Sequence, residues 1–66
     1  MFTPHRCYTH NRMLDAAIYV LKSTKLKDGR YSVRVKWVDR KGRSFGIEER
    51  IKIKKEEVRN WYWLDL

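Results

Sequence analysis

The sequence of 66 residues contains one cysteine, one proline and three glycines, and it has half as many acidic as basic residues. The single Cys7 excludes an internal disulfide, whereas small secreted domains usually carry several. The first residues also lack the basic start and the apolar stretch of a secretory signal. We therefore expect a cytoplasmic protein that works in a reducing compartment.

Long apolar runs and linkers are missing as well. No apolar stretch is long enough to cross a membrane, so we expect no membrane partner. Pro4 is the only proline, and neither a repeat nor a Gly/Ser-rich tract divides the chain. The sequence predicts a flexible N-terminal arm over residues 1–12 and a single small β domain over residues 13–66.

The residues that enzymes and metal sites require are too few. His5, Cys7 and His10 stand close together, but a closed zinc site needs four ligands and the chain has no other Cys or His. No glycine-rich phosphate loop is present, and so short a chain has little bulk for a dry catalytic pocket. We expect no enzymatic activity, no cofactor, no metal ion and no small-molecule substrate.

Basic and hydrophobic residues are what the chain does contain. Sixteen Lys and Arg against eight Asp and Glu give a formal net charge of +8, which favours anionic partners. Hydrophobic residues make up 42% of the chain, which is typical of a folded domain rather than a disordered one.

The clearest strand pattern covers residues 30–38. Tyr31, Val33, Val35 and Trp37 recur at every second position with polar residues between them, which is the period of a half-buried strand. We therefore expect Trp37 to belong to the core with the rest of this row.

A hairpin turn precedes that strand. Asp28-Gly29 suits a two-residue turn, so an upstream strand over residues 16–25 is predicted to pair antiparallel with Thr24 opposite Val33. Lys22 then falls on the apolar face, so this register requires a bulge near Ser23 or an early end to the pairing.

A helix is the alternative for the upstream stretch. Apolar residues between positions 11 and 22 also fit a helical stripe, which predicts an α+β fold with an N-terminal helix on a β-hairpin. The strand is preferred because residues 18–21 run into a good hairpin turn without a helix stop signal.

A second hairpin follows the clearest strand. Closing a three-residue loop with Asp39 opposite Arg43 sets Trp37 against Phe45 and Val35 against Ile47 on the apolar face. Glu49 also lands on that face, so a bulge is predicted at residues 48–49.

The C-terminal sequence predicts one short helical turn over residues 54–60 and an aromatic strand over residues 61–64. Three meandering strands, a helical turn and a final strand resemble the small SH3-like antiparallel barrels of the Tudor, chromo and KOW type. The resemblance covers about residues 16–64 and is one of architecture, so it implies a mainly β fold and no particular ligand.

Cations gather on the sheet face opposite the predicted core, with Glu48 as the only acid among them. The candidate nucleic-acid-binding residues are Lys25, Lys27, Arg30, Arg34, Lys36, Arg50, Lys52 and Lys54. The candidate base-stacking residues are Tyr19, Trp61, Tyr62 and Trp63. The plainer interpretations are a solvated face that keeps the protein soluble and a C-terminal aromatic plug for a small core.

Two function hypotheses follow. The first is a non-catalytic basic binding module that contacts the phosphates of DNA or RNA and reads sequence weakly, because no recognition helix is predicted. The alternative is a small phage-type inhibitor or adaptor that acts in a host cytoplasm on an acidic or nucleic-acid-processing protein partner.

Overall fold

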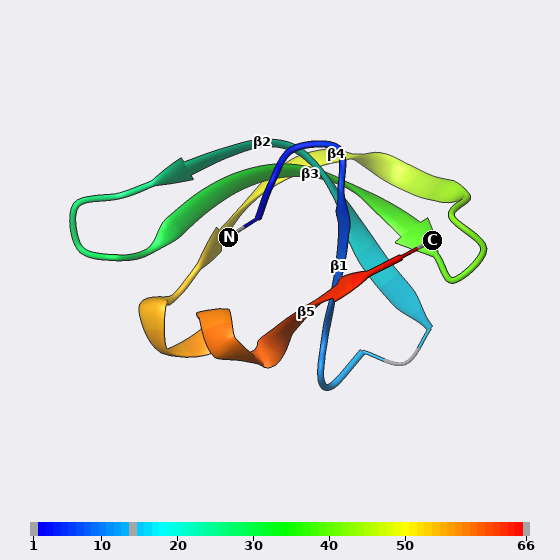
Figure 1. Ribbon diagram of the computed structural model, residues 1–66. Coiled ribbons are helices and arrows are strands. Elements are labelled where there is room, and N and C mark those ends of the chain that lie inside the picture. The colour runs from blue at the N-terminus through cyan, green and yellow to red at the C-terminus, as the bar shows by residue number, and fades with distance from the viewer. Residues whose placement is uncertain (1, 14, 66) are drawn as a thin grey trace.

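The computed structural model describes residues 2–13 and 15–65 and shows a mainly β chain. Its five strands form one antiparallel sheet, with a 3-10 helix before the last strand (Figure 1). In chain order the elements are β1 Cys7–His10, β2 Ala16–Lys25, β3 Tyr31–Asp39, β4 Ser44–Ile53, the 3-10 helix η1 Lys55–Asn60 and β5 Trp61–Leu64. The strands lie side by side in the order β4-β3-β2-β1-β5.

The long strands β2, β3 and β4 curve into an arch, and η1 lies on its hollow side (Figure 1). The predictions of a mainly β fold and of a helical turn before the last strand are confirmed. The predicted closure into a barrel is wrong, because β4 and β5 end the strand order and do not pair in the described part of the chain. Val58 and Trp61 pack against the core from the hollow side, where a closed barrel would bring its two edges together.

The helical alternative for residues 11–22 is also wrong. From Ala16 on, the stretch belongs to β2, whose Ile18 and Val20 pair with Trp37 and Val35 of β3 and are fully buried. Local spacing allowed both structures, and pairing with a distant strand stabilises only the extended one.

The structure corrects the N-terminal boundary of the domain. The segment predicted as a flexible arm, residues 1–12, contains β1, which lies between β2 and β5 in the sheet. Phe2 and Tyr8 are buried, and the backbone N–H of Thr3 donates to the Tyr8 hydroxyl at 2.8 Å. A strand of four residues with one large apolar side chain leaves too weak a pattern to be seen in the sequence.

The turn between β2 and β3 has three residues rather than the predicted two. The Leu26 N–H donates to the Arg30 carbonyl at 2.7 Å, and Gly29 has a φ of 91°, a left-handed conformation that favours glycine. Val33 therefore pairs with Ser23 instead of Thr24. The predicted irregularity in β2 is present, and it lies between Val20 and Lys22.

The second hairpin follows the prediction at its closed end only. The Asp39 N–H donates to the Arg43 carbonyl at 2.8 Å, and Trp37 pairs with Phe45 as expected. The register then shifts, so that Val35 pairs with Glu49 and not with Ile47. Ile47 is 83% exposed as a result, which contradicts its predicted place in the core.

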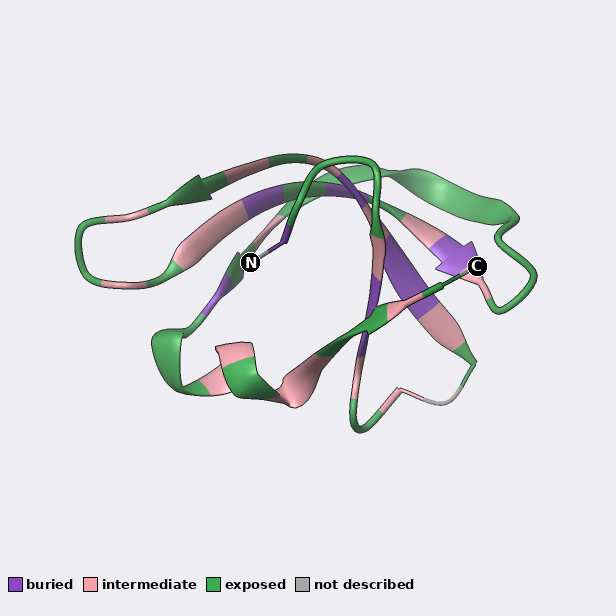
Figure 2. Ribbon diagram, in the orientation of Figure 1, coloured by how far each residue is buried: buried purple, intermediate pink, exposed green. Residues whose placement is uncertain are grey.

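The core lies under the arch, where β1, β2 and β3 each carry buried segments (Figure 2). Its buried residues are Phe2, Tyr8, Ile18, Val20, Val33, Val35 and Ile53. Trp37 packs against this cluster but is only partly buried, and its indole N–H donates to the Glu49 carboxylate. The core of the described chain is thus built from the alternate residues predicted for residues 31–37, from β2, from Ile53 of β4 and from the segment predicted as an arm.

Candidate nucleic-acid interface

The outer side of the arch carries five exposed cations. Residues that stand directly opposite in an antiparallel pair point to the same side of the sheet. Lys22, Arg34 and Arg50 therefore form one row across β2, β3 and β4. Lys36 lies on the same face two residues after Arg34, and Lys52 lies there two residues after Arg50. We call Lys22, Arg34, Lys36, Arg50 and Lys52 the cationic face.

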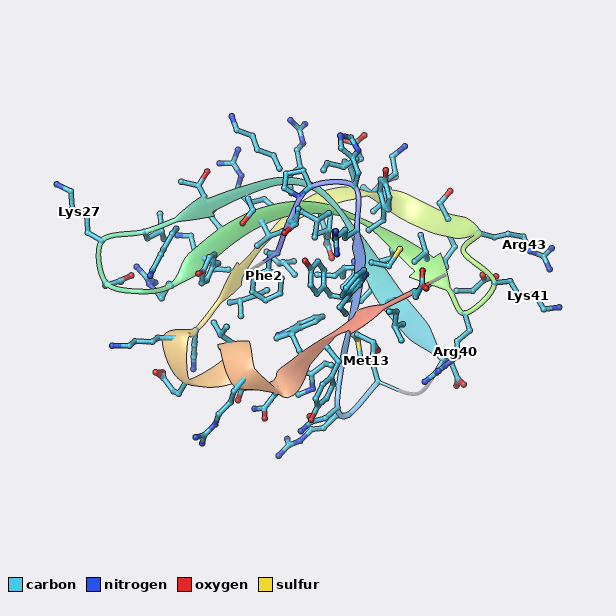
Figure 3. All side chains as sticks on the ribbon, in the orientation of Figure 1. Phe2, Met13, Lys27, Arg40, Lys41 and Arg43 are labelled. Atoms are coloured by element: carbon cyan, nitrogen blue, oxygen red, sulfur yellow. The ribbon has the colours of Figure 1, made fainter. Side chains whose placement is uncertain are left out.

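Figure 3 shows nitrogen-tipped side chains rising from this outer side. Neighbouring strands are about 5 Å apart, and alternate residues along a strand are about 7 Å apart. Like charges directly opposite each other in a sheet are unfavourable, so the row across three strands weakens the fold unless an anion neutralises it.

Lys22 is the member of this face that sequence reasoning missed. The predicted register placed it on the apolar side, opposite Val35 in β3. The three-residue turn pairs it with Arg34 instead and turns its side chain outward, and the register shift between Val20 and Lys22 keeps Val20 on the apolar side. The only signal in the sequence was the charge of Lys22, which is unfavourable on an apolar face and therefore indicated an error in the predicted register.

Glu48 is the acidic side chain beside the cationic face. Its Oε2 lies 3.3 Å from Arg34 Nε, and both side chains are about half exposed. Exposed ion pairs of this kind contribute little to stability and exchange readily with other partners. Among the described residues this is the only ion pair that a cation of the face makes, so four of the five charges have no carboxylate partner.

The remaining predicted cations lie elsewhere. Lys25 pairs with Tyr31 and so belongs to the hollow side, and Lys27 lies at the tip of the β2–β3 hairpin (Figure 3). Arg30 is engaged by Asp28, with Nε 2.6 Å from Oδ2. Lys54 lies between β4 and η1.

Asp28 is fixed by Arg30 from two directions. The Arg30 backbone N–H donates to Asp28 Oδ1 at 3.0 Å, and this bond, together with the guanidinium, lowers the pKa of the Asp28 carboxyl. Arg30 is therefore the ion-pair partner of Asp28, and none of the described lysines forms an ion pair with that carboxylate.

The four predicted stacking residues have different surroundings. Tyr19 lies beside Lys36 on the outer side, where its hydroxyl is 3.0 Å from His5 Nδ1. Trp61 packs against the core and against Phe2. Tyr62 and Trp63 are 52% and 59% exposed, but the guanidinium of Arg6 lies 4.1 Å over the Trp63 ring. A cation–π contact thus already covers one face of Trp63.

His5, Cys7 and His10 do not converge. His5 contacts Tyr19, whereas His10 Nε2 lies 2.9 Å from the Glu57 carboxylate. Burial raises the pKa of the Cys7 thiol, which makes a thiolate less available. Within residues 2–13 and 15–65 no group of three or more His, Cys, Asp and Glu side chains is placed to hold a metal ion.

No helix in the described part of the chain is long and apolar enough to span a membrane. Comparison of the chain with models of protein families, with curated proteins and with solved structures finds no match. The fold and the cationic face are therefore the observations on which a function has to rest.

Proposed function

We propose that this protein is a non-catalytic nucleic-acid-binding module that contacts phosphates through the cationic face. The observation that carries the proposal is the row of Lys22, Arg34 and Arg50 across three paired strands. Three like charges held in register are unfavourable in the free protein, and a chain of phosphates neutralises them together with release of counterions.

The composition of the row supports phosphate as the ligand. Two of its three members are arginines, whose planar guanidinium groups suit the oxygens of a phosphate. No helix other than the short η1 is present among the described residues, so a recognition helix for a groove is not available from them. We infer binding that depends on salt and only weakly on sequence.

The open sheet is also consistent with this proposal. The order β4-β3-β2-β1-β5 with a 3-10 turn before the last strand fits an open variant of a small SH3-like sheet. In this variant one broad face of three long strands stays free for a ligand. We propose the cytoplasm as its place of action, where a lone free cysteine is stable.

The test is a salt series of binding measurements with labelled single- and double-stranded DNA and RNA. Replacing Lys22, Arg34 and Arg50 together by glutamine is expected to lower the slope of log affinity against log salt by about 2 to 3 for duplex DNA. The loss is expected to be equal for unrelated sequences, because phosphate contacts carry no base information.

The matched control removes three exposed cations elsewhere, through Arg12→Gln, Lys41→Gln and Arg59→Gln. This variant has the same net charge and is expected to keep most of the salt slope. Equal losses in both triple variants would contradict a localised face. A wild-type protein that binds none of the four nucleic acids would overturn the proposal and favour an acidic protein partner.

A further inference from the structure

A notch lies between the β2–β3 hairpin and η1, on the hollow side of the arch. Its volume is about 420 Å³, within the range of about 300 to 1,000 Å³ that is typical of small-ligand sites. The lining residues are Lys25, Lys27, Asp28, Gly29, Tyr31, Lys55 and Val58. The cationic face lies on the other side of the same strands.

The charge of the notch is strongly positive. Lys25, Lys27 and Lys55 have no carboxylate partner among the residues that the structure describes. Asp28 is the only acidic residue of the lining, and Arg30 already offsets it at 2.6 Å. Three lysines around one hollow attract an anionic group.

Tyr31 gives the notch an aromatic wall. Its ring is backed by Phe2, with the ring centroids 5.3 Å apart, and Phe2 is fully buried. The Tyr31 hydroxyl makes no hydrogen bond to another described residue, so it is available to a ligand. An aromatic ring held in place beside cations is the combination that binds an unpaired base and its phosphate.

Gly29 keeps the notch in this shape. A Cβ built at Gly29 would lie 2.9 Å from Cδ of Lys55, which is too close for real side chains. The absence of a side chain at Gly29 therefore lets the Lys55 stem lie against the hairpin, where Lys55 lines the notch.

Lysines follow one another along the chain from the cationic face to the notch. Lys52 belongs to the face, Lys54 follows β4, and Lys55 lines the notch. β4 is an edge strand, so these lysines lie along one edge of the sheet, between its two sides.

Resting on the proposed function, we propose that the notch holds one unpaired nucleotide of a single-stranded nucleic acid, with its base against Tyr31 and its phosphate among Lys25, Lys27 and Lys55. A base in a duplex is stacked and paired, and extruding it costs a few kcal/mol. The notch therefore selects single strands over duplexes, whereas the cationic face binds the phosphates of both.

The test compares a short single strand with a blunt duplex of the same sequence by fluorescence anisotropy. Tyr31→Leu keeps apolar bulk against Phe2 and removes the ring, so it is expected to weaken single-strand binding about tenfold. Duplex binding is expected to change less than twofold. Tyr31→Phe keeps the ring and is expected to retain most of the single-strand affinity.

Two double variants separate a built site from bulk charge. Lys27→Gln with Lys55→Gln changes the notch, and Lys41→Gln with Arg43→Gln removes two charges from the β3–β4 hairpin at the far end of the molecule (Figure 3). The notch variant is expected to lose single-strand affinity preferentially. Equal losses for single strand and duplex in both double variants would overturn the notch proposal and leave the proposed function standing.

A direct measurement does not depend on any variant folding. Titration of the wild type with adenosine monophosphate, followed by amide NMR shifts, is expected to perturb residues 27–31 and 55–58 ahead of the rest of the chain. Shifts confined to the cationic face, or no shifts at all, would overturn the notch proposal. If the wild type binds no oligonucleotide at all, the proposed function is overturned, and the notch proposal with it.

Discussion

Phe2 is the largest side chain that the fold buries completely among the described residues, although it lies outside every strand. Its ring packs against Tyr8, Tyr31 and Trp61, with centroid distances between 5.2 and 6.1 Å. Its φ of 58° is a left-handed conformation that a bulky residue rarely adopts, so the burial of the ring has to outweigh the cost of that backbone.

Phe2→Ala is therefore expected to destabilise the domain by about 3 to 5 kcal/mol, the usual cost of truncating a buried Phe. A domain of this size has a total stability near the low end of about 5 to 15 kcal/mol, so the variant should be largely unfolded at room temperature. Urea or thermal denaturation followed by circular dichroism measures the loss.

Thr3→Ala is the control for that experiment. Thr3 is exposed, and only its backbone N–H contacts Tyr8, so its replacement is expected to leave Tm unchanged. A small loss for Phe2→Ala, similar to that of the control, would mean that residues 1–12 are a loose arm in solution.

Glu57 ties η1 to β1. Its carboxylate accepts hydrogen bonds from His10 Nε2 at 2.9 Å and from the Asn60 amide at 3.0 Å, and these bonds lower the pKa of Glu57. The backbone N–H of Arg12 donates to His10 Nδ1, which assigns the proton to Nε2. A lowered carboxyl pKa stabilises the fold above the ordinary glutamate value and ceases to do so as the pH falls through the folded value.

Glu57→Gln is thus expected to lower Tm at neutral pH and to approach the wild-type Tm as the pH falls below the ordinary glutamate pKa of about 4.3. Thermal melts of both proteins across the acid range measure this convergence. Glu56→Gln removes an exposed neighbouring carboxylate and should follow the wild type throughout. A constant difference between Glu57→Gln and the wild type at every pH would argue against the ionised contact.

At the scale of the elements, the course of β4 depends on a register shift in its pairing with β3. Gly46 has a φ of 75°, and it stands where the pairing with β3 shifts between the Trp37–Phe45 and Val35–Glu49 pairs. This shift turns Ile47 to solvent and places Arg50 opposite Arg34. The direct pairing of Arg34 with Arg50 therefore depends on the backbone conformation at Gly46.

Gly46→Ala is expected to cost about 1 kcal/mol, the penalty of a left-handed conformation for an ordinary residue. A Cβ at Gly46 meets nothing within 4 Å, so steric crowding adds nothing to this cost. Gly46→Asn should lose less, because Asn adopts positive φ more readily. Urea denaturation of both variants tests the order, and an Ala variant as stable as the wild type would contradict the left-handed bulge.

At the scale of the whole molecule, charge opposes folding and favours binding. The net charge is +8, and the row of Lys22, Arg34 and Arg50 concentrates part of it on one face. Salt screens this repulsion in the free protein and also competes with the phosphates of a ligand. Stability and nucleic-acid affinity should therefore respond to salt in opposite directions.

We expect Tm of the free protein to rise as potassium chloride is added, because screening weakens the like-charge repulsion. The double variant Lys22→Gln with Arg50→Gln should have a higher Tm at low salt and a smaller rise with added salt. Differential scanning fluorimetry across a salt series measures both. A Tm of the wild type that falls or stays level with salt would show that the row carries no repulsive energy.

The strands β2 to β5 and most of their ends were determined by the sequence. The alternation of Tyr31, Val33 and Val35 has one compatible structure, and β2 has the bounds Ala16–Lys25 that were predicted for it. The loop between Asp39 and Arg43 was predictable for the same reason, because only a three-residue loop keeps Trp37 and Phe45 on one face. These features depend on contacts between neighbours in the sequence or on a period of two.

The tertiary structure decided what depends on pairing between distant segments. The burial of Phe2, the place of β1 beside β5 and the open edges of the sheet come from contacts across almost the full length of the chain. The length of the turn between β2 and β3 decided the candidate site, because a change of register by one residue moves a side chain to the other face of the sheet. Lys22 joined the cationic face and Lys25 left it for this reason, and the register shift between Val20 and Lys22 keeps Ile18 and Val20 in the core. No local pattern in the sequence shows where such a bulge lies.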